Sequence, residues 1–349
     1  MNESIFWFYV ILVQATFMMI HIKYKGITNY FFPKGGLKKK MTLLKILYIT
    51  KDYSKHLERN PFYLSQELSK VTELFIWHQP GNIQTILSQI AFTPDFILLN
   101  DMTEIRCPKI TGLTSTKIPI GIVVYDIHHF RNERKQFIIE NNIKHIFSIC
   151  RDAFHKWYPE FVNKMRWLPH FVNTNIFKEY GLKKEIDLLM LGMVRKDYYP
   201  FRTFIFETFK DKPGFVYKRH PGYLKNTDLQ KNVLSGVEYA KEINRAKIFI
   251  TCDSVFHYPL IKYYEVLASG TLLLAPTSKE LEDLGFLPGI HFVPINYEDV
   301  KIKAEYYLLH EEERKKITQA GYKFVREKHS ATHRALQLLN MIKNILATY

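Results

Sequence analysis

Short apolar and β-branched runs alternate along this chain with amphipathic segments of helix length, beginning near Met41. This alternation is typical of parallel strands joined by crossover helices. In the first half it predicts strands at 43–50, 73–79, 95–101, 118–126, 145–150 and 165–170. Between them, it predicts helices that include 61–70, 82–91 and 131–142. Six such strands complete one doubly wound α/β domain.

The pattern then restarts after a polar segment, 171–184, that is rich in Asn and Lys. Further strands are predicted at 186–193, 214–220, 247–252, 271–277 and 291–295, and two or three helices at 311–346. We therefore expect Rossmann-like domains at 41–172 and 173–330 and a C-terminal helix at 331–349. Open parallel sheets bind ligands beyond the carboxyl ends of their strands, so the two sheets should face a central cleft.

The composition of the chain agrees with two globular cores. It has 349 residues, 47% of them hydrophobic and 24% charged, which excludes a disordered chain and a multi-span membrane protein. Cys107, Cys150 and Cys252 are far apart and lack zinc-site spacing, so we expect reduced core residues. The net charge of +15 suits a nucleotide substrate, an anionic membrane surface or nucleic acid, and it equally suits a general solubility effect.

The first 40 residues add an apolar segment and a basic linker. Residues 5–22 carry no charge except His21 and just reach the length of a membrane-spanning helix. The lysines that follow would keep the rest of the chain in the cytoplasm, anchored to the membrane's cytoplasmic face. Two alternatives stay open: translation starts at Met41, or residues 5–22 form a peripheral helix. Each of these also gives a cytoplasmic protein.

The stretch 253–276 carries the most informative candidate chemistry. Pro259 suits the first turn of a helix and Gly270 suits its C-terminal cap, which predicts a helix at 259–269. Its N-terminus would offer free N–H groups to a diphosphate in the cleft. Glu265 could accept both hydroxyls of a ribose, and Lys262 lies one turn nearer the phosphates.

This stretch resembles the donor-binding signature of the GT-B glycosyltransferases, in particular glycosyltransferase family 1 proteins that include the CgeB-like group. Glu265 is similar in position to the family's ribose-binding glutamate, and Lys262 matches a basic position just before it. The segment 316–339, with His329, Ser330 and Arg334, resembles the family's C-terminal segment. The resemblance implies the GT-B fold and sugar transfer from a nucleotide-sugar donor.

Weaker resemblance extends over residues 45–345 and adds further site residues. Gly192 would permit close backbone approach, and Arg195 would face the diphosphate. Many relatives carry a second glutamate eight residues before the ribose-binding one, where this chain has His257. The role of this position and the stereochemical outcome therefore stay open.

A run of basic residues, Lys218, Arg219 and His220, ends another predicted strand. Such cations could neutralise a diphosphate leaving group, although a solvated loop is an equal alternative. No D-x-D sequence occurs, which leads us to expect a metal-independent enzyme without cofactors, whose nucleotide sugar is a substrate. The predicted donor-binding residues are Gly192, Arg195, Lys218, His220, His257, Lys262, Glu265, Gly270 and Thr271.

Acceptor chemistry is expected in the N-terminal domain, where Asp126 ends an apolar strand. His128 or His129 could act as general base with Asp126 orienting it, or these residues could only cap a loop. Asp101 is a second candidate. An aromatic acceptor platform, unless its members simply pack in the core, would comprise Trp77, His78, Tyr125 and Phe130.

The sequence thus predicts a glycosyltransferase that moves a sugar to a hydroxyl of a glycan, lipid or protein. A catalytically inactive scaffold is an alternative because of His257, and a nucleotide-sugar epimerase is another. Nucleic-acid binding would suit the charge and the 15% aromatic content, but no motif supports it, so no nucleic-acid partner is expected.

Overall fold

The structure, a computed structural model, describes residues 43–220 and 234–349. A six-stranded parallel sheet has the order β2-β1-β4-β6-β7-β8. Its strands are β1 (Lys45–Ile49), β2 (Glu73–Trp77), β4 (Phe96–Asn100), β6 (Ile120–Val124), β7 (His145–Ser148) and β8 (Met165–Trp167). Each predicted strand of the first half is present. All residues of β4 and β6 are buried, as expected for a parallel sheet covered on both faces.

A second parallel sheet has five strands in the order β10-β9-β11-β12-β13. They are β9 (Ile186–Leu191), β10 (Phe215–Lys218), β11 (Ala246–Ile250), β12 (Leu272–Ala275) and β13 (Val293–Pro294). These elements confirm the predicted strands of the second half. A short pair, β3 (Gly81–Asn82) and β5 (Ile110–Thr111), lies apart from both sheets. The division into domains at residue 172 stays a prediction.

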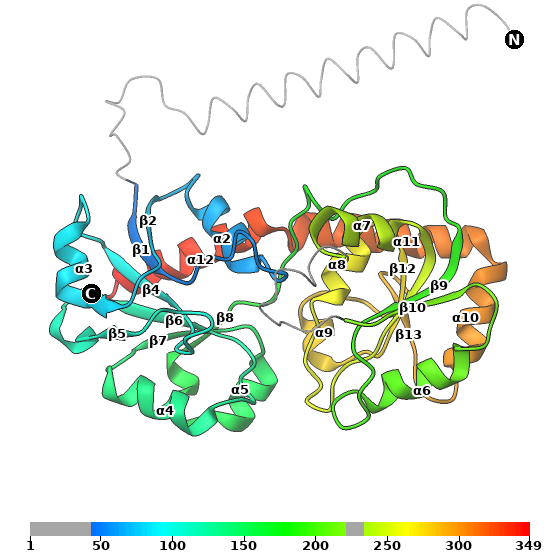
Figure 1. Ribbon diagram of the computed structural model, residues 1–349, viewed down its shortest axis with the longest axis horizontal. Coiled ribbons are helices and arrows are strands. Elements are labelled where there is room, and N and C mark those ends of the chain that lie inside the picture. The colour runs from blue at the N-terminus through cyan, green and yellow to red at the C-terminus, as the bar shows by residue number, and fades with distance from the viewer. Residues whose placement is uncertain (1–42, 221–233) are drawn as a thin grey trace, which may run out of the picture. The chain divides into compact units, whose positions relative to one another are not determined.

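Helices alternate with these strands along the chain (Figure 1). Beside the first sheet's strands come α2 (Asn60–Leu68), α3 (Ile83–Gln89), α4 (Arg131–Glu140) and α5 (Arg151–Trp157). With the second sheet come α6 (Pro200–Phe209), α7 (Gly236–Asn244), α8 (Lys262–Ala268), α9 (Lys279–Asp283), α10 (Val300–Leu309) and α11 (Glu311–Lys328). The last helix is α12 (Ala331–Leu346). Two 3₁₀ turns cover Leu113–Ser115 and Pro159–Lys164.

The last helix returns to the first half of the chain. α12, red in Figure 1, packs against α2, and its buried Leu338, Ile342 and Ile345 join the core of the first sheet. Hydrogen bonds tie the return to the connecting segment, because Val172 N donates to His329 O at 3.0 Å and Ala331 N donates to Val172 O at 2.9 Å. The chain therefore crosses twice between the two sheets at one place.

Both sheets reverse their strand order next to their first strand. The reversal lies between β1 and β4 in the first sheet and between β9 and β11 in the second. In open α/β sheets, ligands bind outside the carboxyl ends of the strands at such a reversal. These two places are therefore where a site is expected.

The predicted apolar segment at residues 5–22 lies outside the described residues. Within residues 43–220 and 234–349, no helix is long and apolar enough to cross a membrane. All three cysteines are buried and unpaired, which confirms their predicted place in the cores.

Candidate active site

Glu265 and Lys262 lie together in the first turn of α8. The helix spans Lys262–Ala268 and is shorter than the predicted 259–269, because residues 259–261 form a non-helical lead-in. Lys262 Nζ donates a hydrogen bond to the Tyr239 hydroxyl at 2.9 Å. Burial raises the pKa of Glu265 against the attraction of Lys262. Burial likewise lowers the pKa of Lys262 against the attraction of Glu265, and Arg202 lowers it further.

Arg202 is a buried cation that the sequence analysis missed. It lies in the first turn of α6, and its side chain bridges the two strands at the reversal of the second sheet. Nη1 donates to Met193 O at 3.1 Å just beyond β9, and Nη2 donates to Thr251 Oγ1 at 3.4 Å just beyond β11. Within the described residues Arg202 forms no ion pair, and its Nε has no hydrogen-bond partner. A buried cation without a carboxylate favours an anionic ligand.

His220 lies near the same cations. Burial, together with the positive charges of Lys262 and Arg202, lowers its pKa to about 4. The imidazole is therefore neutral at pH 7 and adds hydrogen-bonding capacity without adding charge. The region around Lys262, Arg202 and His220 therefore carries more positive than negative charge. Glu265 is the main negative group there.

Gly192 lies where the sequence analysis expected a close approach. Its φ is 143°, and a Cβ added there would be 2.9 Å from Nη1 of Arg202. The group that approaches the glycine backbone is therefore the Arg202 guanidinium. A side chain at position 192 would displace the cation from the sheet reversal.

The remaining predicted donor-side basic residues have acidic partners. Lys218 pairs with Glu242 at 2.6 Å. Arg195 is exposed and pairs with Asp197 two residues on. His257, also exposed, has a φ of 56° and contacts Asp253 at 2.6 Å between Nδ1 and Oδ2. These three side chains are accessible, but each would have to give up its contact with a carboxylate in order to bind a phosphate.

Gly270 and Thr271 lie at the opposite end of α8, before β12 begins, and so at the amino edge of the sheet. This differs from the expectation that they bind the donor. A Cβ at Gly270 would be 2.4 Å from Glu179 Cγ, and Thr271 Oγ1 donates to Ile243 O at 2.7 Å. Their contacts fix the turn into β12.

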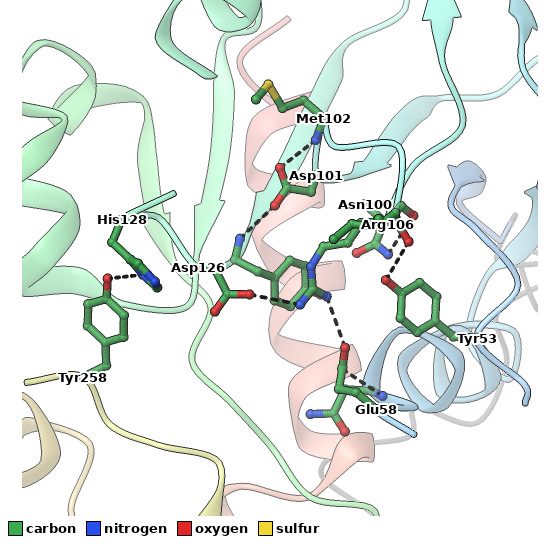
Figure 2. A network of polar contacts seen from close by, with 12 residues as sticks. Tyr53, Glu58, Asn100, Asp101, Met102, Arg106, Asp126, His128 and Tyr258 are labelled. Carbon is green, nitrogen blue, oxygen red and sulfur yellow. Dashed lines mark hydrogen bonds and ion pairs between the residues drawn. The ribbon is translucent and has the colours of Figure 1, made fainter. Parts of the chain in front are cut away.

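At the reversal of the first sheet, Arg106 organises a polar network that Figure 2 shows. Its guanidinium pairs with Glu58 at 3.2 Å and with Asp126 at 3.3 Å. It also lies over the ring of Tyr125, 4.2 Å from the centroid. Asp126 has a φ of 39°, a conformation that non-glycine residues rarely adopt and that occurs often at functional sites. Its carboxylate is 60% exposed and available to a ligand.

Asp101, the second predicted carboxylate, has a different environment. It is buried, pairs with the buried Arg134 at 3.4 Å, and accepts a hydrogen bond from Met102 N at 2.7 Å. A carboxylate held in this way fixes the loop after β4. Among the two predicted carboxylates, Asp126 is the one that solvent reaches.

His128 contacts the second half of the chain rather than Asp126. Its Nδ1 lies 2.9 Å from the Tyr258 hydroxyl, and its ring stacks on Phe256 at 4.2 Å (Figure 2 shows the Tyr258 contact). This differs from the predicted orientation of the histidine by Asp126. Burial, together with the neighbouring His129, lowers the pKa of His128 to about 4, so the ring is neutral at pH 7. The exposed His129 lies beside it, with ring centroids 4.0 Å apart.

The predicted aromatic platform does not form as a group. Trp77, the last residue of β2, donates from Nε1 to Gln79 O at 2.6 Å, and Nδ1 of the next residue, His78, lies 2.7 Å from Thr50 O. Tyr125 is buried under Arg106. Phe130 is exposed and can meet a ligand beside His128.

Residues of α2 and the loop before it approach Glu265 from the first half of the chain. A Cβ added at Gly236, which begins α7, would lie 3.8 Å from Nη1 of Arg59. Burial raises the pKa of Tyr63, Arg59 opposes this increase, and the charge of Glu265 adds to it. Glu58 in turn contributes to the raised pKa of Glu265. Groups from both halves of the chain therefore lie close enough to influence the charge of the Glu265 carboxylate.

Across residues 43–220 and 234–349, no group of three or more His, Cys, Asp or Glu side chains could hold a metal ion.

Comparisons with known proteins give a family model and similar folds. Residues 199–340, which contain Arg202, Lys262 and Glu265, match a family model described as glycosyl transferase-like. No curated protein matches the chain significantly.

Solved structures are similar over nearly the whole fold. A glycosyltransferase from Rickettsia africae is 14% identical with a TM-score of 0.57, covering 87% of this chain and 99% of its own. Sucrose-phosphate synthase from Thermosynechococcus elongatus is 10% identical with a TM-score of 0.63, covering 88% and 100%. HepE from Anabaena, solved with UDP and glucose, is 10% identical with a TM-score of 0.59, covering 86% and 100%. The chain thus has the GT-B fold of glycosyltransferases, and its residues 199–340 match the glycosyl transferase-like family model.

Proposed function

We propose that this protein transfers a sugar from a nucleoside diphosphate sugar to a hydroxyl group of an acceptor. The observation that carries the proposal is the half-buried pair Glu265 and Lys262 beside the buried Arg202, which forms no ion pair within the described residues. A carboxylate suits two ribose hydroxyls, and two neighbouring cations suit a diphosphate. Because burial disfavours the charged forms of both Glu265 and Lys262, an anion bound beside Lys262 would stabilise the charged lysine.

The diphosphate is the leaving group of this reaction, and it needs positive charge as the bond to the sugar breaks. Arg202 and Lys262 would supply that charge from fixed positions, which is how transition-state charge is best stabilised. We propose on this basis that transfer needs no metal ion. Lys218 and Arg195 lie further out, and their acidic partners make them less suited to this role.

Acceptor activation is assigned in this proposal to Asp126. The acceptor oxygen bonds to the anomeric carbon, the bond from that carbon to the diphosphate breaks, and the acceptor proton passes to the Asp126 carboxylate. Arg106 holds this carboxylate in place at 3.3 Å. The neutral His128 would hydrogen-bond the sugar or acceptor while Tyr258 fixes its ring.

The proposal is tested by calorimetric titration with UDP, GDP, ADP and CDP, followed by a hydrolysis screen with the corresponding sugar nucleotides. UDP comes first because HepE, which shares the fold, was solved with it. We expect one nucleoside diphosphate to bind in the micromolar range, about −8 kcal/mol. A folded protein that bound none of them would be a scaffold with this fold, and the proposal would fail.

A further inference from the structure

A pocket of about 320 Å³ lies beside His128, on the N-terminal side of the proposed active site. It is lined by the start of α4 and by Trp157 at the end of α5. The Trp157 ring also packs edge-on against Phe256 and Tyr258, with centroids 5.6 and 6.0 Å apart. The pocket therefore lies where the first half of the chain meets the loop before α8.

The lining combines aromatic rings with cationic, anionic and neutral polar groups. Arg131 lies over the Trp157 ring, 5.5 Å from its centroid, and Phe130 is 55% exposed. Asn132 and Glu133 complete the polar side. Neither Arg131 nor Glu133 forms an ion pair within the described ranges 43–220 and 234–349, whereas Lys135 is paired with Glu160 at 2.7 Å. The pocket thus offers a cationic donor, a carboxylate acceptor and an amide that is both.

Resting on the proposed function, we infer that this pocket binds the acceptor and that the acceptor is a sugar residue. Sugar hydroxyls both donate and accept hydrogen bonds, which matches Arg131, Asn132 and Glu133. The C–H face of a sugar ring packs on aromatic rings such as Trp157 and Phe130. A volume of about 320 Å³ is at the small end of ligand pockets and suits one or two sugar rings.

A lipid chain fits this lining poorly, because it would bury charged groups without giving them hydrogen bonds. A serine or threonine side chain brings a single hydroxyl and leaves most of the polar groups without a partner. The pocket also adjoins His128, two residues after Asp126 in the chain. A sugar bound there would place its hydroxyls next to the proposed reacting groups.

The test is ligand-observed saturation-transfer NMR on the full chain without nucleotide. The probes are methyl glycosides of glucose, mannose, galactose and N-acetylglucosamine, a threonine-containing tetrapeptide and dihexanoylglycerol. We expect at least one glycoside to bind, and neither of the other probes to bind more tightly. In Arg131→Ala and Glu133→Gln the dissociation constant should rise about tenfold, as for one lost hydrogen bond to a charged group. Lys156→Ala removes an exposed charge from α5 outside the pocket, and it should change the dissociation constant by less than about twofold.

Preferential binding of the tetrapeptide or the glycerolipid would overturn the inference. So would glycoside binding that Arg131→Ala and Glu133→Gln leave unchanged. Because nucleotide is absent from this experiment, its result is separate from the nucleotide titration. Glycoside binding without any nucleotide binding would overturn the proposed function and keep the assignment of the pocket to sugars.

Discussion

Glu280 joins the two halves of the chain and gives a quantitative prediction. It lies on α9, is almost fully buried, and accepts hydrogen bonds from the backbone N–H groups that begin α5. The distances are 2.5 Å to Arg151 N and 3.4 Å to Asp152 N. The Arg151 side chain strengthens the contact by pairing with Asp283 at 2.8 Å. The carboxylate thus caps a helix that belongs to the other sheet.

Burial raises the pKa of Glu280 from 4.5 to about 6, with the Asp152 charge adding to the increase and the Arg151 and Asp152 N–H groups and the Arg151 charge opposing it. The folded protein then holds this proton more tightly than the unfolded chain. The resulting stabilisation is complete below pH 4.5 and is lost as the pH rises through about 6. Since one pH unit corresponds to about 1.4 kcal/mol, the loss is about 2 kcal/mol by pH 7.5.

The Glu280→Gln protein lacks this titration and keeps an acceptor oxygen. Its free energy of unfolding relative to the wild type should therefore increase by about 2 kcal/mol between pH 4 and pH 7.5. Chemical denaturation across this pH range measures the difference. Glu282→Gln, on the exposed side of the same helix, is the control and should run parallel to the wild type. If the Glu280→Gln and wild-type curves were also parallel, the assignment of a burial-raised pKa to Glu280 would be refuted.

Other predictions concern the turn after α8 and the chemistry. Gly270→Ala should lower the free energy of unfolding by about 2 kcal/mol, because the new Cβ meets Glu179. Gly181 has a similar φ but open space around it, so Gly181→Ala should lower the free energy of unfolding by about 1 kcal/mol. Equal melting temperatures of the two variants would contradict this prediction. Asp126→Asn should reduce kcat for transfer about 100-fold or more, while the nucleotide Kd changes by less than about twofold; retained turnover would exclude Asp126 as the base. Transfer after dialysis against EDTA should proceed at the original rate, and loss restored by Mg²⁺ or Mn²⁺ would contradict the metal-free mechanism.

The strands were predictable from the sequence because a parallel sheet covered on both faces needs continuous apolar runs. β4 and β6 are such runs, and every one of their residues is buried. The nearness of Lys262 and Glu265 was equally predictable, since three residues along a helix place both on one face. Periodicity and helix spacing are local, so local sequence is sufficient for them.

The rest of the site depends on contacts between distant residues. Arg202 meets Met193 and Thr251 only because β9 and β11 are neighbours in the sheet. His128 and Tyr258 are 130 positions apart and meet because the two halves of the chain touch there. No periodicity in the sequence signals such pairs.

The placement of Gly270 and Thr271 has a simpler physical reason. A helix that starts at the carboxyl edge of a parallel sheet must carry the chain back to the amino edge before the next strand begins. Residues after α8 are therefore on the far side from Lys262 and Glu265. The position of Gly270 at the end of the helix was predicted correctly, because helices often end at a glycine with positive φ, and the φ of Gly270 is 65°.

The central claim is that Glu265 and Lys262 bind different parts of one nucleotide. The direct measurement compares the affinities of the preferred nucleoside diphosphate and of its bare nucleoside for the wild type, Glu265→Gln and Lys262→Met. Glu265→Gln should weaken both ligands about equally, by tenfold or more, as for a lost charge-assisted hydrogen bond to ribose. Lys262→Met should weaken the diphosphate by a similar factor and leave the nucleoside unchanged. Equal diphosphate affinity in all of these proteins would contradict the account.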